Sequence, residues 1–246
     1  MAIHESINDG IVRLVMDNPP VNALNISDTY SLAEKIRNYS TADSQGKVIL
    51  LTAMGKGFCA GVDIKEMQKM PGNQGIIEAN RSCYQLFKAI EDSIIPVLVA
   101  VNGHCLGSGI GIAGSADVLI AAEGATFGLP EIDNGALGGA TYLLRLVSIQ
   151  RARWMLYSCE TATAEELKVF GSVLKVVSAE DLDRTLTDLA ETIAKKNPEL
   201  VRAAKASFDG IVGSDLSRKY RFEQGYTFEM NLLGIGDKAR DAFLEQ

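Results

Sequence analysis

The sequence predicts an α/β fold, in which a largely parallel β-sheet is covered by helices. Three short runs of β-forming apolar residues recur in the first half of the chain, at 47–52, 96–101 and 117–122. The first two runs are each followed by a glycine-rich turn and a helical pattern. Strands that alternate with helices in this way pair in parallel. From residue 163 onward the pattern is mostly helical.

Length and composition indicate one large domain with a terminal extension. The chain has 246 residues, of which 47% are hydrophobic and 22% charged, and this is enough to form a single core. We expect a core at residues 1–195 and a helical oligomerisation region at 196–246. The formal net charge of -7 and the lack of a basic stripe argue against a nucleic-acid partner.

Cysteine use and hydropathy indicate a cytoplasmic protein without a membrane partner. Cys59, Cys83, Cys105 and Cys159 are scattered and form no C-x-x-C pair, so we expect reduced thiols and no metal site. The N-terminal residues lack a charged start followed by an apolar core, so no secretory signal is expected. No apolar stretch approaches the length needed to span a membrane.

The first elements are predicted to be a hairpin and a helix. Asn8-Asp9-Gly10 separates two short runs, and residues 11–16 are rich in β-formers. The prolines at 19 and 20 end the second strand, because proline cannot donate to a central ladder. Ser27 is expected to cap a helix that ends near Tyr39.

The last third of the chain is predicted to pack and assemble. Thr163-Ala-Glu-Glu166 has the spacing of a capping box. Apolar residues recur at helical spacing over 179–195, 198–211 and 216–232, and Pro198 suits a first helical turn. We expect Tyr226, Phe228 and Met230 to lie at a subunit interface.

Two glycine-rich turns, at 55–61 and 103–109, follow buried strands that should be neighbours. One such turn alone is explained by tight backbone packing. Two of them at adjacent strand ends can present two backbone N–H groups to one oxygen, as an oxyanion hole. Neither turn matches a P-loop or a dinucleotide fingerprint, and Gly107-Ser108-Gly109 is not a nucleophile elbow.

Five segments match one known family in order. Gly57-Phe-Cys-Ala-Gly-Val-Asp-Ile-Lys-Glu-Met67 is similar to the F-x-A-G-x-D-[IL] segment of the crotonase superfamily, the enoyl-CoA hydratase/isomerase family. Residues 97–109 resemble its second signature, and 116–117, 125–131 and 135–139 continue the match. The resemblance covers essentially the whole chain. It implies a crotonase spiral of ββα units with a helical C-terminal trimerisation region.

The resemblance also implies a site for an acyl-CoA thioester. The backbone N–H groups of Val62 and Ser108 would hold the thioester oxygen and stabilise an enolate, and Glu131 would be the catalytic base. CoA arrives as part of the substrate, so no permanently bound cofactor is expected, and homotrimers or dimers of trimers are implied. The expected contacts to CoA or to the acyl group are Lys56, Ala60, Gly61, Asp63, Ile64, Lys65, His104, Gly107 and Gly111.

One position departs from the pattern of the family's hydratases. Hydration places water between two carboxyl groups. The second position matches Glu131, but the first falls on Gly111. We interpret Gly111 as open space that admits a bulkier acyl group. Taken alone, Glu131 after Pro130 would also suit the start of a helix, where a carboxylate complements the dipole.

Further segments resemble one branch of the family. Residues 17–23, 62–68, 78–83 and 220–232 are similar to bacterial steroid-degradation enzymes that open a ring in a bicyclic indanedione-type acyl-CoA. This resemblance favours a hydrolase of a β-diketone acyl-CoA. A Δ3,Δ2-enoyl-CoA isomerase or hydratase, and a non-catalytic acyl-CoA-binding protein, are the alternatives.

Other polar residues have simpler interpretations. His104 is expected to pack or to bond the backbone, although it is also placed to orient water or substrate. Asn80 and Arg81 lie either in the acyl pocket or on a solvated helix face. Asp133 is expected to be exposed in a turn, despite its closeness to Glu131.

Overall fold

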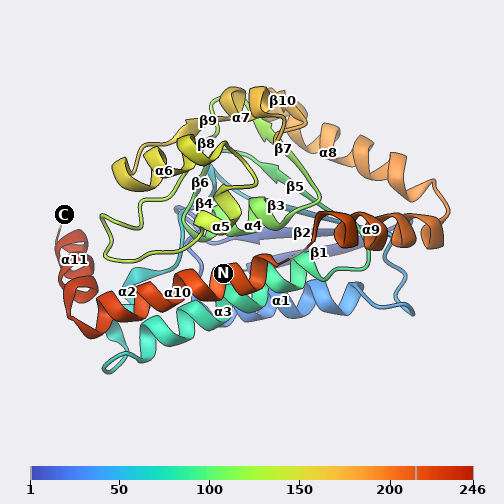
Figure 1. The fold of residues 1–246 in the computed structure, drawn as a ribbon. Helices are drawn as coiled ribbons and strands as arrows, with labels where there is room; N and C mark the ends of the chain where they lie inside the picture. The colour runs from blue at the N-terminus through green and yellow to red at the C-terminus, as the bar shows by residue number, and fades with distance from the viewer. Residues whose placement is uncertain (1, 214, 246) are drawn as a thin grey trace.

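The computed structural model describes residues 2–213 and 215–245 and has the predicted α/β architecture (Figure 1). A 6-stranded sheet has the order β1-β2-β3-β5-β7-β10. All its pairs are parallel except the hairpin β1–β2, in which Asn8 faces Ile11 across the predicted turn. Its strands are β1 (Ala2–Asn8), β2 (Ile11–Asp17), β3 (Val48–Ala53), β5 (Val97–Val101), β7 (Val118–Ala122) and β10 (Lys175–Val177).

A smaller 4-stranded sheet runs beside the first in the order β4-β6-β8-β9. Its strands are β4 (Gly57–Cys59), β6 (His104–Leu106), β8 (Thr126–Gly128) and β9 (Ala162–Thr163). The first three each follow a strand of the main sheet, so the chain repeats a unit of two strands and a helix. This repetition is the predicted spiral of two-strand units.

Helices cover both faces of the main sheet (Figure 1). Successive residues of β3 alternate between two apolar layers, because neighbouring strand residues point to opposite faces. Ile49 packs with helices α1 (Ile26–Tyr39) and α3 (Gln74–Glu91), whereas Leu50 packs under α8 (Ala179–Ala194). The other helices of the core are α2 (Ile64–Lys69), α4 (Ser108–Ser115), α5 (Ala140–Leu143), α6 (Ile149–Ser158) and α7 (Ala164–Phe170).

The predicted cap of α1 was wrong by two residues. Asn25 is the N-cap, and its Oδ1 accepts from the Asp28 amide at 2.8 Å. Asn is as good a cap as Ser and comes first, so Ser27 lies inside the first turn. The cap at Thr163 is confirmed, since its Oγ1 accepts from the Glu166 amide at 3.1 Å.

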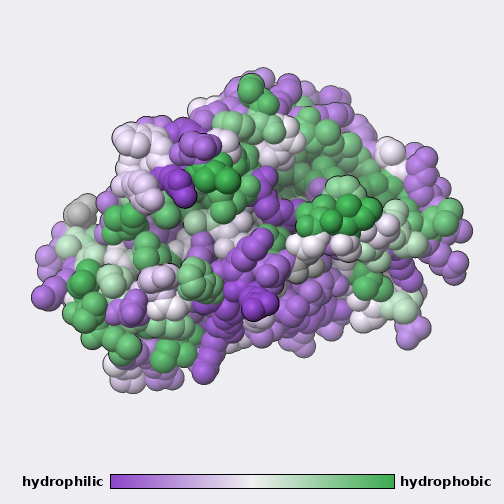
Figure 2. Space-filling view, in the orientation of Figure 1, coloured by the Kyte–Doolittle hydropathy of each residue, from purple (hydrophilic) through white to green (hydrophobic). Residues whose placement is uncertain are grey.

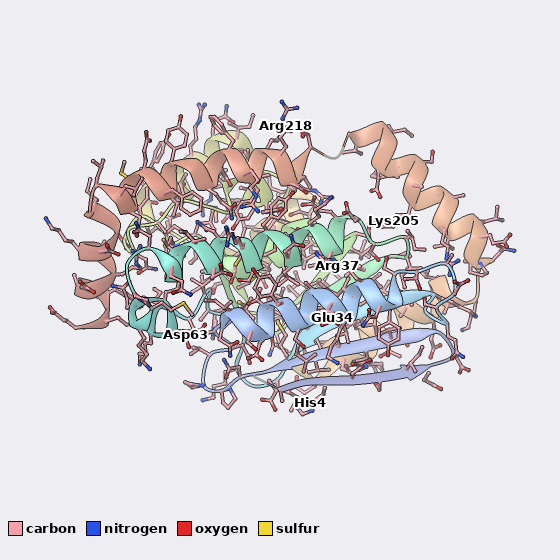
Figure 3. All side chains as sticks on the ribbon, turned by 90° about the horizontal axis from the view of Figure 1, so that it is seen from below. His4, Glu34, Arg37, Asp63, Lys205 and Arg218 are labelled. Carbon is pink, nitrogen blue, oxygen red and sulfur yellow. The ribbon has the colours of Figure 1, made fainter. Side chains whose placement is uncertain are left out.

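Three helices end the chain: α9 (Pro198–Val212), α10 (Leu216–Leu232) and α11 (Ile235–Leu244). Pro198 begins α9, as predicted. Figure 3, the view from below, shows α10 beside α3, with α1 next in the layer, and Asp63 at the end where α2 and α11 lie. No described helix combines the length and the apolar character needed to cross a membrane.

Helix α9 stands away from the core and buries none of its own residues. Leu200, Phe208 and Ile211 are 71%, 66% and 79% exposed, and Figure 2 shows apolar surface over this helix. A salt bridge ties α9 to the body, because Lys205 Nζ lies 2.7 Å from Asp117 Oδ1. An apolar helix face of this size is typical of a surface that meets another protein.

Candidate active site

The two glycine turns meet at the end of the smaller sheet. Gly107 has φ 56 and ψ -117, a conformation that side chains rarely adopt. A β-carbon at Gly107 would lie 3.0 Å from Glu131 Oε1 and 3.2 Å from Gly61 Cα. The two turns therefore approach backbone to backbone, and the carboxylate of Glu131 lies against their junction.

Each turn leaves one amide without an acceptor at this junction. Ser108 is the first residue of α4, whose N-cap, Gly107, makes no side-chain cap bond. The first N–H groups of a helix have no partner within it. Within residues 2–213 and 215–245, neither the Val62 nor the Ser108 amide donates to the backbone or a side chain. Val62 and Ser108, which both line the cavity described next, thus each have a backbone N–H group that is free to donate.

A cavity of about 90 Å³ lies at the junction. Its lining brings together most of the residues that the sequence singled out, and adds several from the helices. The principal lining residues are Ala60, Gly61, Val62, Ile64, Met67, Asn80, Cys83, Phe87, Gly107, Ser108, Glu131, Asn134, Leu137, Tyr220, Thr227 and Arg240.

A larger cavity, of about 720 Å³, lies under α9 and α10. Asp117, Arg145 and Lys205 are among the residues that line it. It contains none of the residues predicted for the site, and one of its walls is the detached helix α9. The larger cavity is therefore not the one at which the predicted residues come together, and the candidate site is the smaller cavity.

Glu131 lies in a turn after β8, and the next helix, α5, begins only at Ala140. The interpretation of Glu131 as a helix-dipole carboxylate was therefore wrong. The residue is partly accessible, but its Oε2 atom is buried and has no hydrogen-bond partner. Burial raises the pKa of Glu131 to about 8, with the charge of Glu223 as a smaller cause. A carboxylate with such a pKa is a stronger base than an exposed one.

Glu223 is a second buried carboxylate, which sequence reasoning missed. It lies on α10, and its Oε1 accepts from the Thr141 amide at 2.8 Å, at the start of α5. Burial raises the pKa of Glu223 to about 7. No local pattern could have revealed it, because it approaches Glu131 only through the packing of α10 on the core.

The space expected at Gly111 is absent, and this prediction was wrong. A β-carbon at Gly111 would lie less than 3.0 Å from three atoms of the Phe87 ring. Phe87, from α3, lines the cavity in its place, and Gly111 lies behind it. The ring centroid of Phe87 is 4.9 Å from that of Tyr142 and 5.3 Å from that of Tyr220. An aromatic cluster therefore forms this wall.

Several predicted contacts lie outside the cavity. His104 packs across Gly57, and its Nε2 is 3.2 Å from the carbonyl oxygen of Val21, which fits the packing interpretation. Asp63 caps α2, where its Oδ1 accepts from the Glu66 amide at 3.1 Å. Lys56 and Lys65 are exposed and do not line the cavity, so their contact with CoA stays a prediction.

Other polar residues also lie either in the cavity lining or outside it. Asn80 lines the cavity, whereas Arg81 is exposed and pairs with Glu78 at 2.8 Å. Asp133 is exposed in the turn, as expected. Asn134 and Arg240 line the cavity and were not predicted. An arginine in the last helix gives no sequence signal of its own, since its approach to the site depends on how α11 folds back.

Comparison with known proteins assigns the family. The profile described as Enoyl-CoA hydratase/isomerase matches residues 6–246. The chain is 47% identical over 237 residues to the (7aS)-7a-methyl-1,5-dioxo-2,3,5,6,7,7a-hexahydro-1H-indene-carboxyl-CoA hydrolase of Rhodococcus jostii (strain RHA1), which covers 96% of this chain and 92% of that protein. The Mycobacterium tuberculosis (strain ATCC 25618 / H37Rv) protein of the same name is 45% identical over 237 residues, or 96% of each chain.

A solved structure agrees with the fold. The enoyl-CoA hydratase/isomerase of Pseudoalteromonas atlantica T6c aligns with a TM-score of 0.87 at 25% identity, over 100% of this chain and 97% of that one. Membership of one family accounts for the ordered motifs, the spiral of two-strand units and the paired glycine turns. The chain belongs to the enoyl-CoA hydratase/isomerase family, the crotonase superfamily.

Proposed function

We propose that this protein is an acyl-CoA hydrolase that opens a ring of a bicyclic β-diketone acyl-CoA in steroid degradation. The single observation that carries the proposal is the cavity in which Glu131 faces two free amides with an aromatic wall in place of a second carboxylate. The two relatives named as indene-carboxyl-CoA hydrolases, at 47% and 45% identity, support the choice of acyl group.

The substrate would be held by its thioester. The amides of Val62 and Ser108 donate to the thioester oxygen, and the helix dipole of α4 adds positive potential at Ser108. These donors are fixed by the backbone of the two glycine turns, so they need no rearrangement when charge develops on the oxygen. CoA enters as part of the substrate and stays on the ring-opened product as its thioester, so it is not a resident cofactor.

Water would be activated between two acceptors. Glu131 Oε2 and Asn134 Oδ1 are both buried without a partner, and both residues line the cavity. A water molecule that donates one hydrogen bond to each of these atoms keeps a lone pair of its oxygen free to attack the ketone carbon. Glu131 then removes a proton while the water oxygen bonds to the ring-ketone carbon.

Collapse of that adduct breaks the ring bond beside the ketone. The bonding electrons pass into an enolate delocalised onto the thioester oxygen, where the Val62 and Ser108 amides stabilise the charge. Glu131 returns its proton to carbon. The ketone carbon becomes a carboxylic acid that stays attached through the rest of the opened ring. One water is added and one ring is opened, and no oxidant is required.

The test is turnover of an indanedione-type acyl-CoA in ¹⁸O-labelled water. The expected product is a ring-opened acid with one labelled oxygen in its new carboxyl group. Glu131→Gln should lose at least about 10³-fold in kcat while retaining CoA-ester binding. Glu123→Gln is a matched control, because Glu123 is exposed and lies outside the cavity. Full activity of Glu131→Gln would refute this mechanism.

We further propose a homotrimer or a dimer of trimers in the cytoplasm. The exposed apolar residues Leu200, Phe208 and Ile211 of α9 support assembly, since a surface of this kind is stabilised by burial. Sedimentation equilibrium should give three or six times the chain mass of 26.5 kDa. Phe208→Glu should shift the population toward monomers.

A further inference from the structure

The polar lining of the cavity contains donors that the proposed mechanism does not use. Four cavity residues have a buried side-chain atom without a hydrogen-bond partner: Asn80 Nδ2, Glu131 Oε2, Asn134 Oδ1 and Arg240 Nη1. Two of these atoms are acceptors, and the water described above accounts for them. The other two are donors. Because buried donors in proteins nearly always have a hydrogen-bond partner, we expect an oxygen of the ligand to be the acceptor.

Arg240 is the stronger donor and is held firmly. The residue is only 2% exposed, although it stands on the last helix of the chain. Its Nε donates to Gln68 Oε1 of α2 at 3.0 Å, and its Nη2 donates to Asn231 and Asp237. These bonds fix the guanidinium plane and leave Nη1 as the one nitrogen of this side chain without an acceptor.

The free nitrogen lies near the turn that carries Glu131. A β-carbon at Gly236 would be 3.0 Å from Arg240 Nη1 and 2.7 Å from the Gly135 carbonyl oxygen. Gly135 follows Asn134 in the turn that contains Glu131. Arg240 thus approaches the cavity from the side of the carboxylate.

The charge around Arg240 favours a neutral ligand oxygen. Asp237 already pairs with the guanidinium, so a second carboxylate is not needed for charge balance. Glu131 lines the same cavity and would repel an anionic acyl group when ionised. A ketone oxygen accepts from Nη1 without either conflict, and it gains negative charge when water attacks its carbon.

We propose that Arg240 Nη1 binds the oxygen of the ring ketone that water attacks, and so forms a second oxyanion site separate from the Val62 and Ser108 amides. This assignment rests on the proposed hydrolase function for the identity of the ketone. Donors placed where charge develops typically contribute 10²- to 10³-fold to kcat. Arg240 is then a catalytic residue contributed by α11, and α11 is a functional wall of the site as well as a packing helix.

The test compares two ligands in two variants. The ligands are an indanedione-type acyl-CoA and its analogue with a methylene in place of the ring ketone, with affinities measured by calorimetry. The wild type should bind the ketone about 10-fold or more tightly, as expected for a hydrogen bond to a charged donor. Arg240→Met should bind both alike and lose roughly 10²-fold or more in kcat. Arg240→Lys should recover part of the preference.

Arg202→Met is the matched control. Arg202 also has a buried nitrogen without a partner, Nε, but it stands on α9 and does not line the cavity. It should keep the ketone preference of the wild type. Equal binding of both ligands by the wild type, or an unchanged preference in Arg240→Met, would overturn the inference.

The affinity measurements distinguish a failure of this inference from a failure of the proposed function. A wild type that prefers the ketone but opens no ring would refute hydrolysis and still support the Arg240 subsite. Ring opening by a wild type with no ketone preference would support hydrolysis and refute the Arg240 subsite. Thermal unfolding of each variant shows whether it folds. If Arg240→Met does not fold, the comparison of the two ligands on the wild type still tests the inference.

Discussion

The Phe87 ring occupies the space into which a side chain at Gly111 would extend. Because Phe87 lines the cavity and contacts Tyr142 and Tyr220, the cavity has an aromatic wall in this region. A family member with a second glutamate at this position would need a different residue at 87. The glycine and the phenylalanine therefore act as a pair, and the first prediction follows from it.

Gly111→Glu is expected to destabilise the protein by more than about 3 kcal/mol. The substitution overlaps a buried ring and places a carboxylate in an apolar layer. Urea denaturation measures the effect. Gly225→Glu is the matched control, since Gly225 is a helical glycine with nothing near its β-carbon position, and it should fold at least as well as the wild type. Adding Phe87→Ala to Gly111→Glu should restore part of the lost stability.

Activity should rise with pH through about 8. The base must be ionised to accept a proton, and burial raises the pKa of Glu131 to about 8, so most molecules are inactive at pH 6.5. The pH dependence of kcat/KM for ring opening measures this midpoint. Glu223→Gln removes a neighbouring negative charge and should move the midpoint down. A rate that is level between pH 6 and 9 would contradict the role of Glu131.

Glu131→Gln should stabilise the protein at alkaline pH. The folded-state pKa, about 8, is above the ordinary 4.5, so between these values the folded chain holds a proton that the unfolded chain has released. Stability from this group is therefore greatest below pH 4.5 and falls as pH rises toward 8. At pH 9 the variant should exceed the wild type by on the order of 2–4 kcal/mol in unfolding free energy. At pH 4.5 the difference should nearly vanish.

Hydration of crotonyl-CoA should be at least about 10²-fold slower than ring opening. Syn addition of water uses two carboxyl groups, and the removal of one general acid or base typically costs 10²- to 10⁴-fold. Glu223 does not replace the missing group, because its carboxylate accepts from the Thr141 amide at the start of α5 and the residue does not line the cavity. Initial rates with both substrates at saturating concentration measure the ratio. Comparable rates would contradict the one-carboxylate interpretation.

Local sequence determined the elements and the first half of the site. The alternation of β-runs, glycine turns and helices predicted the parallel sheet, because these patterns depend on backbone conformation and on which face is buried. The resemblance of the motifs to the family implied that Gly61, Gly107 and Glu131 would line one site, and the structure brings them together. The α1 cap failed only because two good capping residues stand two positions apart.

Tertiary packing alone decided what surrounds Glu131. Phe87 and Arg240 line the cavity from α3 and α11, and Glu223 approaches Glu131 from α10. None of the three is near Glu131 in sequence. Gly111 shows the reason most clearly: the sequence records the absence of a side chain, but only the packing of α3 on α4 shows which side chain fills the space. Local patterns specify conformation, whereas the occupant of a volume depends on contacts between distant segments. The lone acid was therefore readable from the sequence, and its environment was not.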